Sequence, residues 1–544
     1  YTMTANLDNG HSFITTQKVV DTTIRLLSGQ NSPITTQHLM QSILRLTEQG
    51  QLVRELLNRK DVVYLRAMHE AELYLTENLS RMAENNYQYD FDVEELMTAL
   101  ETDNDLKYAP LQREAIAAAA KNGLVILTGG PGTGKSTTVH GMVRILEALG
   151  LNVVLAAPTG RAAKRLSELC GMEAKTIHRL LEAGYQGGFG RLGFQRCRTN
   201  PLECDAVILD EVSMVDIQLM QALVEALPHG ARLVLVGDAD QLPPVGPGNF
   251  LRDVIASRRV PTIQLKEIFR QAQESDIVMN AHAINMGQMP VASGKDGDFF
   301  IMRKSSAADI IDTVASLCAV RLPRHYGFTP SQIQVLSPSR RQGAGTMQLN
   351  RTLQEVLNPP SDGKAEKRFG DTIFRTGDRV MQVRNNYDIV WDRMDGSDSG
   401  CGMFNGDVGE IIQIFPEQEC LSVRFDDKLA TYTYDMLGEL ELAYAMTVHK
   451  AQGSEFDAVV VALAPGTNAR LLTRNILYTA ITRAKKLLVI VGSPDVLHDM
   501  IDNGKRGRRY SALKLRLRGV TTEPITSETI VELPEPDRTH EETD

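Results

Sequence analysis

The sequence is poor in cysteine and has no long apolar run, and both shortages exclude whole classes of protein. Six cysteines are spread over 544 residues without the close pairs that a zinc site or a redox motif requires, so we expect reduced thiols. No stretch approaches the roughly 18 to 20 uninterrupted apolar residues of a bilayer span. The start of the chain also lacks an apolar signal region. We therefore expect a cytoplasmic protein that has no membrane partner.

An excess of positive charge is also missing. The formal net charge is −10, which argues against a uniformly basic coat for nucleic acid. From Thr521 to Asp544 eight acidic residues accompany one arginine, so this stretch carries −7 of the −10 and the rest of the chain −3. The rest of the chain has a net charge close to zero and can still contain a basic groove. We expect residues 519–544 to form a disordered tail, because the segment is acidic and contains prolines.

The composition is that of a globular protein with several domains. The length corresponds to roughly three to five folding units. Apolar residues at 42% and charged residues at 23% are ordinary globular values. The chain begins at Tyr1 rather than at methionine, which fits either a fragment of a longer protein or a start at Met3. Residues 1–105 show helical periodicity without chemical motifs, which predicts an N-terminal helical domain.

After Tyr108 the pattern changes to short apolar runs, each closed by a glycine-rich or acidic turn and followed by a helix. This α/β pattern predicts parallel sheets with helices on both faces. The runs form two sets, which implies two similar domains, residues 106–272 and residues 273–368 together with 441–518. The first set is 124–127, 153–156, 207–209 and 233–236, and the second is 333–336, 443–448, 458–462 and 487–491.

Two insertions interrupt these domains. Residues 369–440 carry short alternating runs between Gly, Asn and Asp turns, which predicts an inserted small β-barrel. Residues 184–198 are glycine-rich and place Tyr185, Phe189 and Phe194 close to arginines. This segment fits either a projecting β-hairpin or an ordinary mobile surface loop.

The strongest chemical motif lies between an apolar run and a predicted helix. It reads Gly-Gly-Pro-Gly-Thr-Gly-Lys-Ser over residues 129–136. Glycines allow backbone N–H groups to converge on phosphate oxygens, and the N-terminus of the next helix favours an anion. Lys135 would reach the β and γ phosphates of ATP, and Ser136 can bind Mg²⁺. The nucleotide-binding residues expected here are Gly129, Gly130, Pro131, Gly132, Thr133, Gly134, Lys135, Ser136 and Thr137.

Two later loops also follow apolar runs. Asp210 and Glu211 come directly after the run 206–209, which places two carboxylates at the carboxyl edge of a parallel strand. One carboxylate can hold Mg²⁺ while its neighbour polarises the attacking water, so Ser136 and Asp210 are the expected metal ligands. The loop after the run 233–236 contains Gln241, which could sense the γ-phosphate.

The order of these and further motifs resembles that of superfamily-1 helicases, and most of all the RecD-like 5′-to-3′ DNA helicases. The motifs are Gln112, the phosphate loop, Ala-Pro-Thr-Gly-Arg-Ala-Ala at 157–163, Asp-Glu-Val-Ser at 210–213, Gly-Asp-Ala-Asp-Gln at 237–241, Ile-Phe-Arg-Gln at 268–271, Val-His-Lys-Ala-Gln-Gly-Ser-Glu at 448–455 and Tyr-Thr-Ala-Ile-Thr-Arg at 478–483. The resemblance covers nearly everything from about residue 10 to 518. It implies two RecA-like P-loop NTPase domains, a Src-homology-3-like barrel at 369–440 and a strand-splitting pin at 184–198.

The resemblance also implies roles for individual residues. Gln112 would recognise adenine, and Glu211 would be the general base for ATP hydrolysis. Arg270 and Arg483 would stabilise the charge that develops on the transferred γ-phosphoryl group, each reaching it from the second domain or the cleft between the domains. Glu455 would belong to the nucleotide site.

Single-stranded DNA would lie across the tops of both α/β domains. Short polar and basic side chains suit contacts with the DNA backbone that do not read the sequence. The candidates are Thr159, Arg161, His178, Pro243, Arg340, Thr447 and His449. We therefore expect an ATP- and Mg²⁺-dependent DNA helicase that translocates 5′ to 3′, unwinds 5′-tailed duplexes in DNA repair or recombination, and works as a monomer.

Two other functions stay open at this stage. An RNA or RNA–DNA helicase is compatible with motifs that contact backbone more than bases. A clamp that binds single strands under nucleotide control, without unwinding, is also compatible, although Glu211 and the two arginines weigh against it. Members of the family commonly carry a further N-terminal domain, which we do not expect within these 544 residues, so any partner that such a domain would contact stays unknown.

Overall fold

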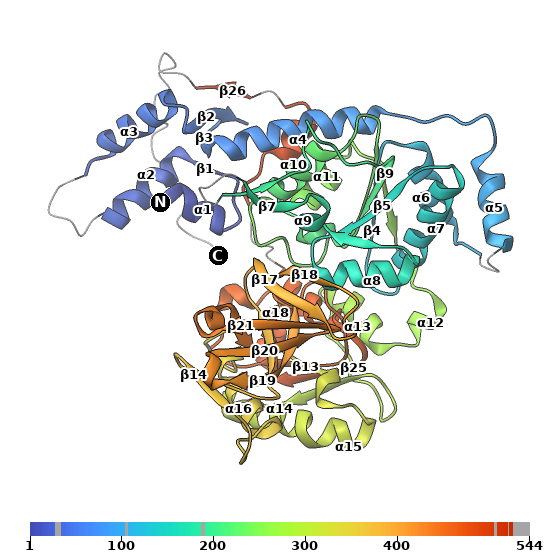
Figure 1. Cartoon of the computed structure of the whole chain (residues 1–544). Coiled ribbons are helices and arrows are strands. Elements are labelled where there is room, and N and C mark those ends of the chain that lie inside the picture. The colour runs from blue at the N-terminus through green and yellow to red at the C-terminus, as the bar shows by residue number, and fades with distance from the viewer. Residues whose placement is uncertain (28–33, 104–106, 187–190, 505–508, 521, 526–544) are drawn as a thin grey trace.

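The computed structural model describes residues 1–27, 34–103, 107–186, 191–504, 509–520 and 522–525 (Figure 1). Two parallel sheets form its centre, one in the upper and one in the lower half of the view. We call the parts built on them the first and the second domain. The expectation of two α/β domains with parallel sheets is therefore confirmed. None of the helices in the described ranges has the length and apolar character that a bilayer crossing requires.

The first domain contains a six-stranded sheet in the order β11-β4-β10-β9-β5-β6, with every neighbouring pair parallel. Its strands are β4 (Leu124–Gly129), β5 (Val153–Ala157), β6 (Ala174–Thr176), β9 (Ala206–Leu209), β10 (Arg232–Gly237) and β11 (Thr262–Leu265). The predicted runs correspond to β4, β5, β9 and β10, which are almost completely buried. The edge strands β6 and β11 were not predicted, because they are short and only partly buried.

Alternate residues of the central strands contribute to two separate apolar cores. In β10, Leu233 and Leu235 belong to one core, whereas Val234 and Val236 belong to the other. The first core is covered by α4 (Arg66–Glu84), α10 (Ile217–Ala226) and α11 (Phe250–Ser257), and the second by α6 (Pro110–Lys121), α7 (Lys135–Ala148) and α8 (Gly160–Cys170). Because α4 comes from the N-terminal region, that region completes one face of the first sheet.

The N-terminal region has the expected helices and also a small antiparallel sheet. The helices are α1 (Thr2–Asp8), α2 (Thr16–Leu27), α3 (Thr36–Glu48), α4 and α5 (Val93–Asp103), and the strands are β1 (Phe13–Thr15), β2 (Leu52–Leu57) and β3 (Lys60–Leu65). Asn58 and Arg59, between β2 and β3, have positive φ of 47° and 64°. Two such residues make the turn that a tight hairpin favours. The sheet was not predicted, because long helices flank the two short strands.

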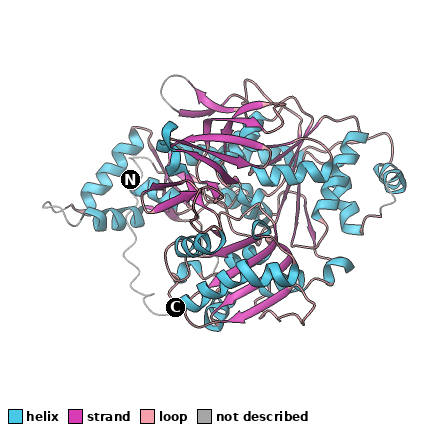
Figure 2. Cartoon of the chain, turned by 60° about the horizontal axis from the view of Figure 1, so that its bottom comes forward, coloured by secondary structure: helices cyan, strands magenta, loops and turns pink. Residues whose placement is uncertain are grey.

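The second domain contains a five-stranded parallel sheet in the order β12-β25-β24-β13-β23. Its strands are β12 (Phe299–Arg303), β13 (Ile333–Ser337), β23 (Ala445–Thr447), β24 (Phe456–Leu463) and β25 (Ala484–Gly492). One core lies under α13 (Asp276–Asn285), α17 (Arg474–Ile481) and α18 (Pro494–Asp502), and the other under α14 (Ala307–Ser316) and α16 (Thr346–Leu357). Figure 2 shows helices in cyan lying over these strands in the lower part of the view.

The insertion in the second domain is a separate seven-stranded antiparallel sheet in the order β18-β17-β21-β20-β19-β16-β22. Its strands are β16 (Arg379–Gln382), β17 (Asn386–Arg393), β18 (Ser399–Met403), β19 (Val408–Phe415), β20 (Cys420–Phe425), β21 (Lys428–Thr433) and β22 (Leu440–Leu442). It has its own core, which contains Trp391, Phe425 and Tyr432. A short hairpin, β14 (Glu366–Phe369) with β15 (Thr372–Arg375), precedes it. We call this insertion the barrel domain.

The glycine-rich insertion of the first domain is a hairpin. Strands β7 (Ala183–Gln186) and β8 (Arg191–Phe194) pair antiparallel, with Ala183 opposite Phe194. Of the two interpretations of this segment, the hairpin is therefore confirmed. Its tip, residues 187–190 with the predicted Phe189, lies outside the described residues.

After α18 the chain returns to the N-terminal region. Helix α19 (Leu513–Leu517) packs against α4 and α11, and β26 (Glu523–Pro524) pairs with β2. Ile525 is 4% exposed, and its N–H donates to the carbonyl oxygen of Arg54 at 3.0 Å. The expectation of a disordered tail from residue 519 is thus wrong for these residues, because the open edge of β2 supplies hydrogen-bond partners. Residues 526–544 lie outside the described residues.

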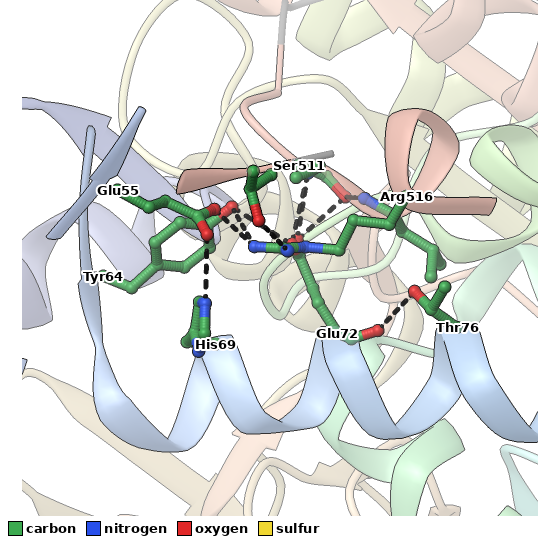
Figure 3. A network of polar contacts seen from close by, with 10 residues as sticks. Glu55, Tyr64, His69, Glu72, Thr76, Ser511 and Arg516 are labelled. Atoms are coloured by element: carbon green, nitrogen blue, oxygen red, sulfur yellow. Dashed lines mark hydrogen bonds and ion pairs between the residues drawn. The ribbon is translucent and has the colours of Figure 1, made fainter. Parts of the chain in front are cut away.

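A network of buried charges fixes this return (Figure 3). Arg516 of α19 is 7% exposed and forms ion pairs with Glu55 of β2 and, at 3.5 Å, with Glu72 of α4. Glu72 also accepts hydrogen bonds at 3.1 Å from the Ser511 hydroxyl and from the Ala512 N–H. Burial raises the pKa of Glu72, because it disfavours the charged carboxylate. One guanidinium therefore neutralises carboxylates from two elements at once.

Candidate active site

The phosphate-binding loop lies between β4 and α7, at the carboxyl edge of the first sheet. Gly132 and Gly134 have positive φ of 73° and 80°, which favours glycine at both positions. Lys135 begins α7, and its Nζ donates to the carbonyl oxygens of Gly129 at 2.6 Å and Gly130 at 2.9 Å. Residues 130–136 line a pocket of about 290 Å³. Of the predicted loop residues, only Gly129 and Thr137 are not part of its wall.

Gln112 connects the start of the first domain to this loop. Its side chain is 3% exposed, and Oε1 accepts from the N–H of Ala109 at 2.9 Å. Nε2 donates to the carbonyl oxygen of Gly134 at 3.3 Å. Gln112 does not line the pocket, so recognition of adenine by this residue stays a prediction.

Asp210 and Glu211 follow β9 and line the same pocket. Glu211 has a positive φ of 52°, a conformation that costs energy in a residue with a side chain and is often found at functional sites. Its N–H donates to Oδ1 of Asp210 at 2.8 Å. Burial first, and the charge of Glu211 second, raise the pKa of Asp210, whereas the charges of Arg165 and Lys135 lower it. Two adjacent, half-buried carboxylates favour the binding of a cation.

The donor set fits Mg²⁺. In the described part of the chain, no group of three or more His, Cys, Asp or Glu side chains is arranged to hold a metal ion. Mg²⁺ needs no such group, since it commonly binds one or two carboxylates together with phosphate oxygens and water. Ser136 and Asp210 both line the pocket and offer the hard oxygen ligands that this ion prefers.

Gln241 lies in the loop after β10 and is 8% exposed. Its Oε1 is buried and has no hydrogen-bond partner among the described residues, although the side chain lines the pocket. A buried acceptor without a partner costs free energy of about 1–3 kcal/mol, so such a group is expected to have a ligand in the working state. A water molecule or a protonated phosphate oxygen would satisfy it.

Arg483 lines the pocket from the turn between α17 and β25 of the second domain. The residue is 3% exposed. Its guanidinium donates to the carbonyl oxygens of Thr479 at 3.2 Å and Ser454 at 3.3 Å, and to the Thr482 hydroxyl at 3.2 Å. These partners are neutral, and among the described residues no carboxylate forms an ion pair with Arg483. The charge of this arginine is thus available to an anion in the pocket.

Arg270 cannot be placed in the same way. It begins the short helix α12 (Arg270–Gln273), and the preceding Phe269 donates its N–H to the carbonyl oxygen of Gly132 in the phosphate loop at 3.3 Å. The side chain of Arg270 lies outside the described part of the structure. Its proposed contact with the γ-phosphate stays a prediction.

Glu455 lines the pocket from the second domain, but its carboxylate is engaged with side chains. It forms an ion pair with Arg165 of α8 in the first domain and lies 3.5 Å from Nζ of Lys485. Both cations also line the pocket, and neither was predicted. Helical spacing could have identified Arg165, because it lies four residues after Arg161 on the same helix.

A second pocket, of about 540 Å³, lies between the first domain, the second domain and the barrel domain. We call it the channel. The predicted DNA contacts Thr159, Arg161, His178 and His449 line it, whereas Pro243, Arg340 and Thr447 do not. The barrel domain contributes Asn385, Phe404, Asn405, Gly406 and Asp407, which were not predicted. The two turns that hold them have no sequence motif, and only the fold brings these turns to the channel.

The basic groups of the channel are partly shielded from solvent. Burial lowers the pKa of His178 and of His449, so both imidazoles are neutral near pH 7. The Arg161 guanidinium lies 5.4 Å from the ring centre of Phe456. Phe194 of β8 packs against the core of the first domain, with its ring 5.9 Å from that of His178. This hairpin aromatic therefore stabilises the base of the hairpin instead of projecting from it.

Family models match three segments of the chain. Residues 107–299 match a model described as an AAA domain, residues 349–425 match the SH3 domain of ATP-dependent RecD-like DNA helicases, and residues 442–491 match the C-terminal domain of UvrD-like helicases. The second match agrees with the antiparallel barrel domain.

Curated relatives match over a longer stretch. An ATP-dependent RecD2 DNA helicase of Deinococcus radiodurans is 37% identical over 407 residues, which cover 75% of this chain and 52% of the relative, so the match spans about half the length of that protein. The RecD subunit of the RecBCD enzyme of Mycobacterium tuberculosis is 32% identical, over 75% of this chain and 72% of the relative. Among solved structures, Bacteroides Pif1 bound to ssDNA is 20% identical, with a TM-score of 0.42, over 71% of this chain and 92% of that chain.

Proposed function

Since the chain belongs to the RecD-like family of ATP-dependent DNA helicases, we propose that it hydrolyses ATP to move 5′ to 3′ along single-stranded DNA and to unwind duplex DNA in repair or recombination. One observation carries this proposal. Arg483 of the second domain lines the same nucleotide pocket as Lys135 of the first, without a carboxylate partner in the described part of the chain. An arginine delivered across a cleft couples closure of the cleft to phosphoryl transfer.

The chemistry follows from the residues of the pocket. Lys135 and the backbone N–H groups of the loop bind the β and γ phosphates, and Glu211 orients the attacking water and accepts its proton. Arg483 stabilises the charge that develops on the γ-phosphoryl group. Ser136 and Asp210 would hold Mg²⁺, which would neutralise phosphate charge when bound. Gln241 offers its unpartnered Oε1 to the attacking water.

Movement along DNA follows from the position of the channel. The nucleotide pocket and the channel both lie between the first and the second domain. A change in the distance between these domains during the ATP cycle therefore moves the walls of the channel as well. We propose single-stranded DNA and 5′-tailed duplexes as substrates, a monomer as the working unit and the cytoplasm as its location.

The test is a fluorescence unwinding assay with ATP and Mg²⁺ on three duplexes, which carry a 5′ tail, a 3′ tail or no tail. We expect unwinding of the 5′-tailed duplex alone. Unwinding of the 3′-tailed duplex alone would reverse the proposed direction. A parallel ATPase assay with matched DNA and RNA oligonucleotides separates a DNA helicase from an RNA helicase. Stimulated hydrolysis without unwinding would indicate a nucleotide-controlled clamp.

The hairpin β7–β8 is proposed to separate the strands at the fork. Stacking of an aromatic side chain on a base contributes about 1–3 kcal/mol, which is comparable with about 1.4 kcal/mol for opening one base-pair step. Replacing residues 187–193 by a short Gly-Ser turn keeps Phe194 in its core position. We expect this variant to retain DNA-stimulated ATPase and single-strand translocation while it loses unwinding. Retained unwinding would exclude the hairpin as the separating element.

A further inference from the structure

Helix α8 lines both functional pockets. Its first turn, with Thr159, Gly160 and Arg161, contributes to the channel, and Arg165, one turn later, lines the nucleotide pocket. Residues four apart in a helix lie on the same face, so the geometry of α8 itself directs Arg161 and Arg165 to adjacent sites. A displacement of α8 by DNA would therefore move Arg165.

The second domain has a matching segment. His449, Gln452 and Ser454, in the turns between β23 and β24, line the channel. Glu455 follows immediately and lines the nucleotide pocket. Gly453 in this segment has a positive φ of 69°, and a Cβ there would come within 2.7 Å of the Thr159 hydroxyl, so the two segments approach each other closely. Both segments thus extend from the channel to the nucleotide pocket.

The ion pair between Arg165 and Glu455 joins these two segments across the cleft. Its side chains are 45% and 22% exposed, and a pair this open contributes only about 0–1 kcal/mol to stability. The ion pair therefore does little to hold the two domains together, and we look for another role. Arg165 lines the same pocket as Asp210 and Lys135, so its charge already lies beside the proposed metal and phosphate site.

The pair also differs from two neutral contacts across the cleft. Leu242 donates its N–H to the Thr479 hydroxyl at 3.1 Å, and Gln452 donates to the Leu242 carbonyl oxygen at 3.1 Å. These contacts are neutral, and an incoming phosphate has little reason to displace them. Bound ATP would instead attract Arg165 and repel Glu455, because its phosphates are strongly negative.

We propose that Arg165 exchanges Glu455 for a phosphate of the bound nucleotide, and that this exchange couples occupancy of the channel to ATP hydrolysis. The proposal rests on the proposed function and names the residues that link its two sites. In the nucleotide-free protein, Glu455 is the positioning residue that holds Arg165. In the ATP-bound protein, the released Glu455 would still have Lys485 as a partner, whose Nζ lies 3.5 Å from its carboxylate in this structure. Because coupling is reciprocal, DNA that shifts α8 and residues 449–455 toward the exchanged arrangement also favours ATP binding.

The experiment measures the ratio of ATPase kcat with and without a thymidine oligonucleotide in R165Q, E455Q and the double variant R165E/E455R. The affinity of the same oligonucleotide is measured with and without a non-hydrolysable ATP analogue. We expect the stimulation ratio to fall about tenfold or more in R165Q, with a matching loss of the effect of the analogue on DNA affinity. The matched control is K164Q, which removes the neighbouring exposed pair of α8 with Asp426 of the barrel domain and should keep the ratio.

The double variant distinguishes an exchanging pair from a fixed bridge. R165E/E455R can rebuild the ion pair, but a glutamate at position 165 cannot move to a phosphate. We expect its stimulation ratio to stay low, and a restored ratio would overturn the exchange. An unchanged ratio in R165Q, including the case in which basal and stimulated rates fall by the same factor, would also overturn it. Absence of stimulation in the wild-type protein would reject the proposed function itself, so the two failures are distinguishable.

Discussion

Two junctions of this molecule use ion pairs in opposite ways. At the return of the C-terminal segment, the side chains of Arg516, Glu55 and Glu72 are 4%, 2% and 0% exposed (Figure 3). At the cleft between the two parallel sheets, Arg165 and Glu455 are 45% and 22% exposed. A buried charge is costly to leave without a partner, whereas a half-exposed charge can be solvated by water. The comparison teaches that the first junction is built to stay closed and the second can change partners.

The largest effect is expected on the ATPase activity of the cleft, when the groups that act on the γ-phosphate are removed. We expect R483A and E211Q to lower kcat of the DNA-stimulated ATPase by about 10³-fold each, roughly 4 kcal/mol in activation free energy. ATP binding should change little, because both groups act mainly in the transition state. Steady-state kinetics and a nucleotide-binding titration measure the two effects separately. The control is K486Q. Lys486 lies in β25, just after Arg483, and its substitution removes an ion pair with Asp457 but should leave kcat unchanged. A normal kcat in R483A would remove the arginine from the mechanism.

The buried junction should respond to one substitution with a large loss of stability. R516A leaves Glu55 and Glu72 without their shared cation, and we expect the free energy of unfolding of this region to fall by about 3–5 kcal/mol. Urea unfolding, together with hydrogen exchange of α4 and α19, measures this loss. The counterpart R165A should change stability by at most about 1 kcal/mol. If R516A and R165A lost the same free energy of unfolding, the proposed difference between the buried and the exposed junction would be wrong.

The same junction contains a carboxyl that should limit stability at high pH. Burial raises the pKa of Asp253 on α11 to about 7, from an ordinary value of 3.8. Because the folded pKa is the higher one, the stability that this group contributes is complete below pH 3.8 and is lost as the pH rises through 7. We therefore expect D253N to be more stable than the wild type by about 2 kcal/mol at pH 8, and by less at pH 5.

Thermal unfolding at both pH values tests this expectation. D499N, which changes an exposed aspartate, is the control and should show no such difference. A D253N variant that is less stable than the wild type at pH 8 would mean that the charged carboxylate has a partner in the folded protein.

The smallest effect is expected for the exposed pair between Lys164 and Asp426, whose side chains are 58% and 69% exposed. K164Q should change the free energy of unfolding by less than about 0.5 kcal/mol, because solvent screens both charges. Urea titration of the wild type and the variant is sufficient. A loss above about 1 kcal/mol would show that contact between α8 and the barrel domain stabilises the fold.

The fold and the site can be predicted best from the sequence where a chemical motif directly follows the periodic pattern of a strand. Asp210 and Glu211 directly follow one buried strand, and Lys135 ends the glycine-rich loop after another, so both the parallel sheets and the centre of the pocket could be derived. The channel turn around Phe404 and the pairing of Arg165 with Glu455 could not, because both depend on how separate domains meet. The strand β26 was missed for a similar reason, since its two residues have no strand pattern of their own and depend on the open edge of β2.

The return of the C-terminal segment also constrains how the protein is made. Arg516 is 461 positions from Glu55 in the chain. At a synthesis rate of about 5–20 residues per second, roughly 20 to 90 s pass between the appearance of the two residues on the ribosome. During this interval the nascent chain carries Glu55 and Glu72 without their cation and β2 with an unpaired edge. The N-terminal region, although translated before the segment that completes it, should be among the last parts to mature, and its open strand edge is where a chaperone would be needed.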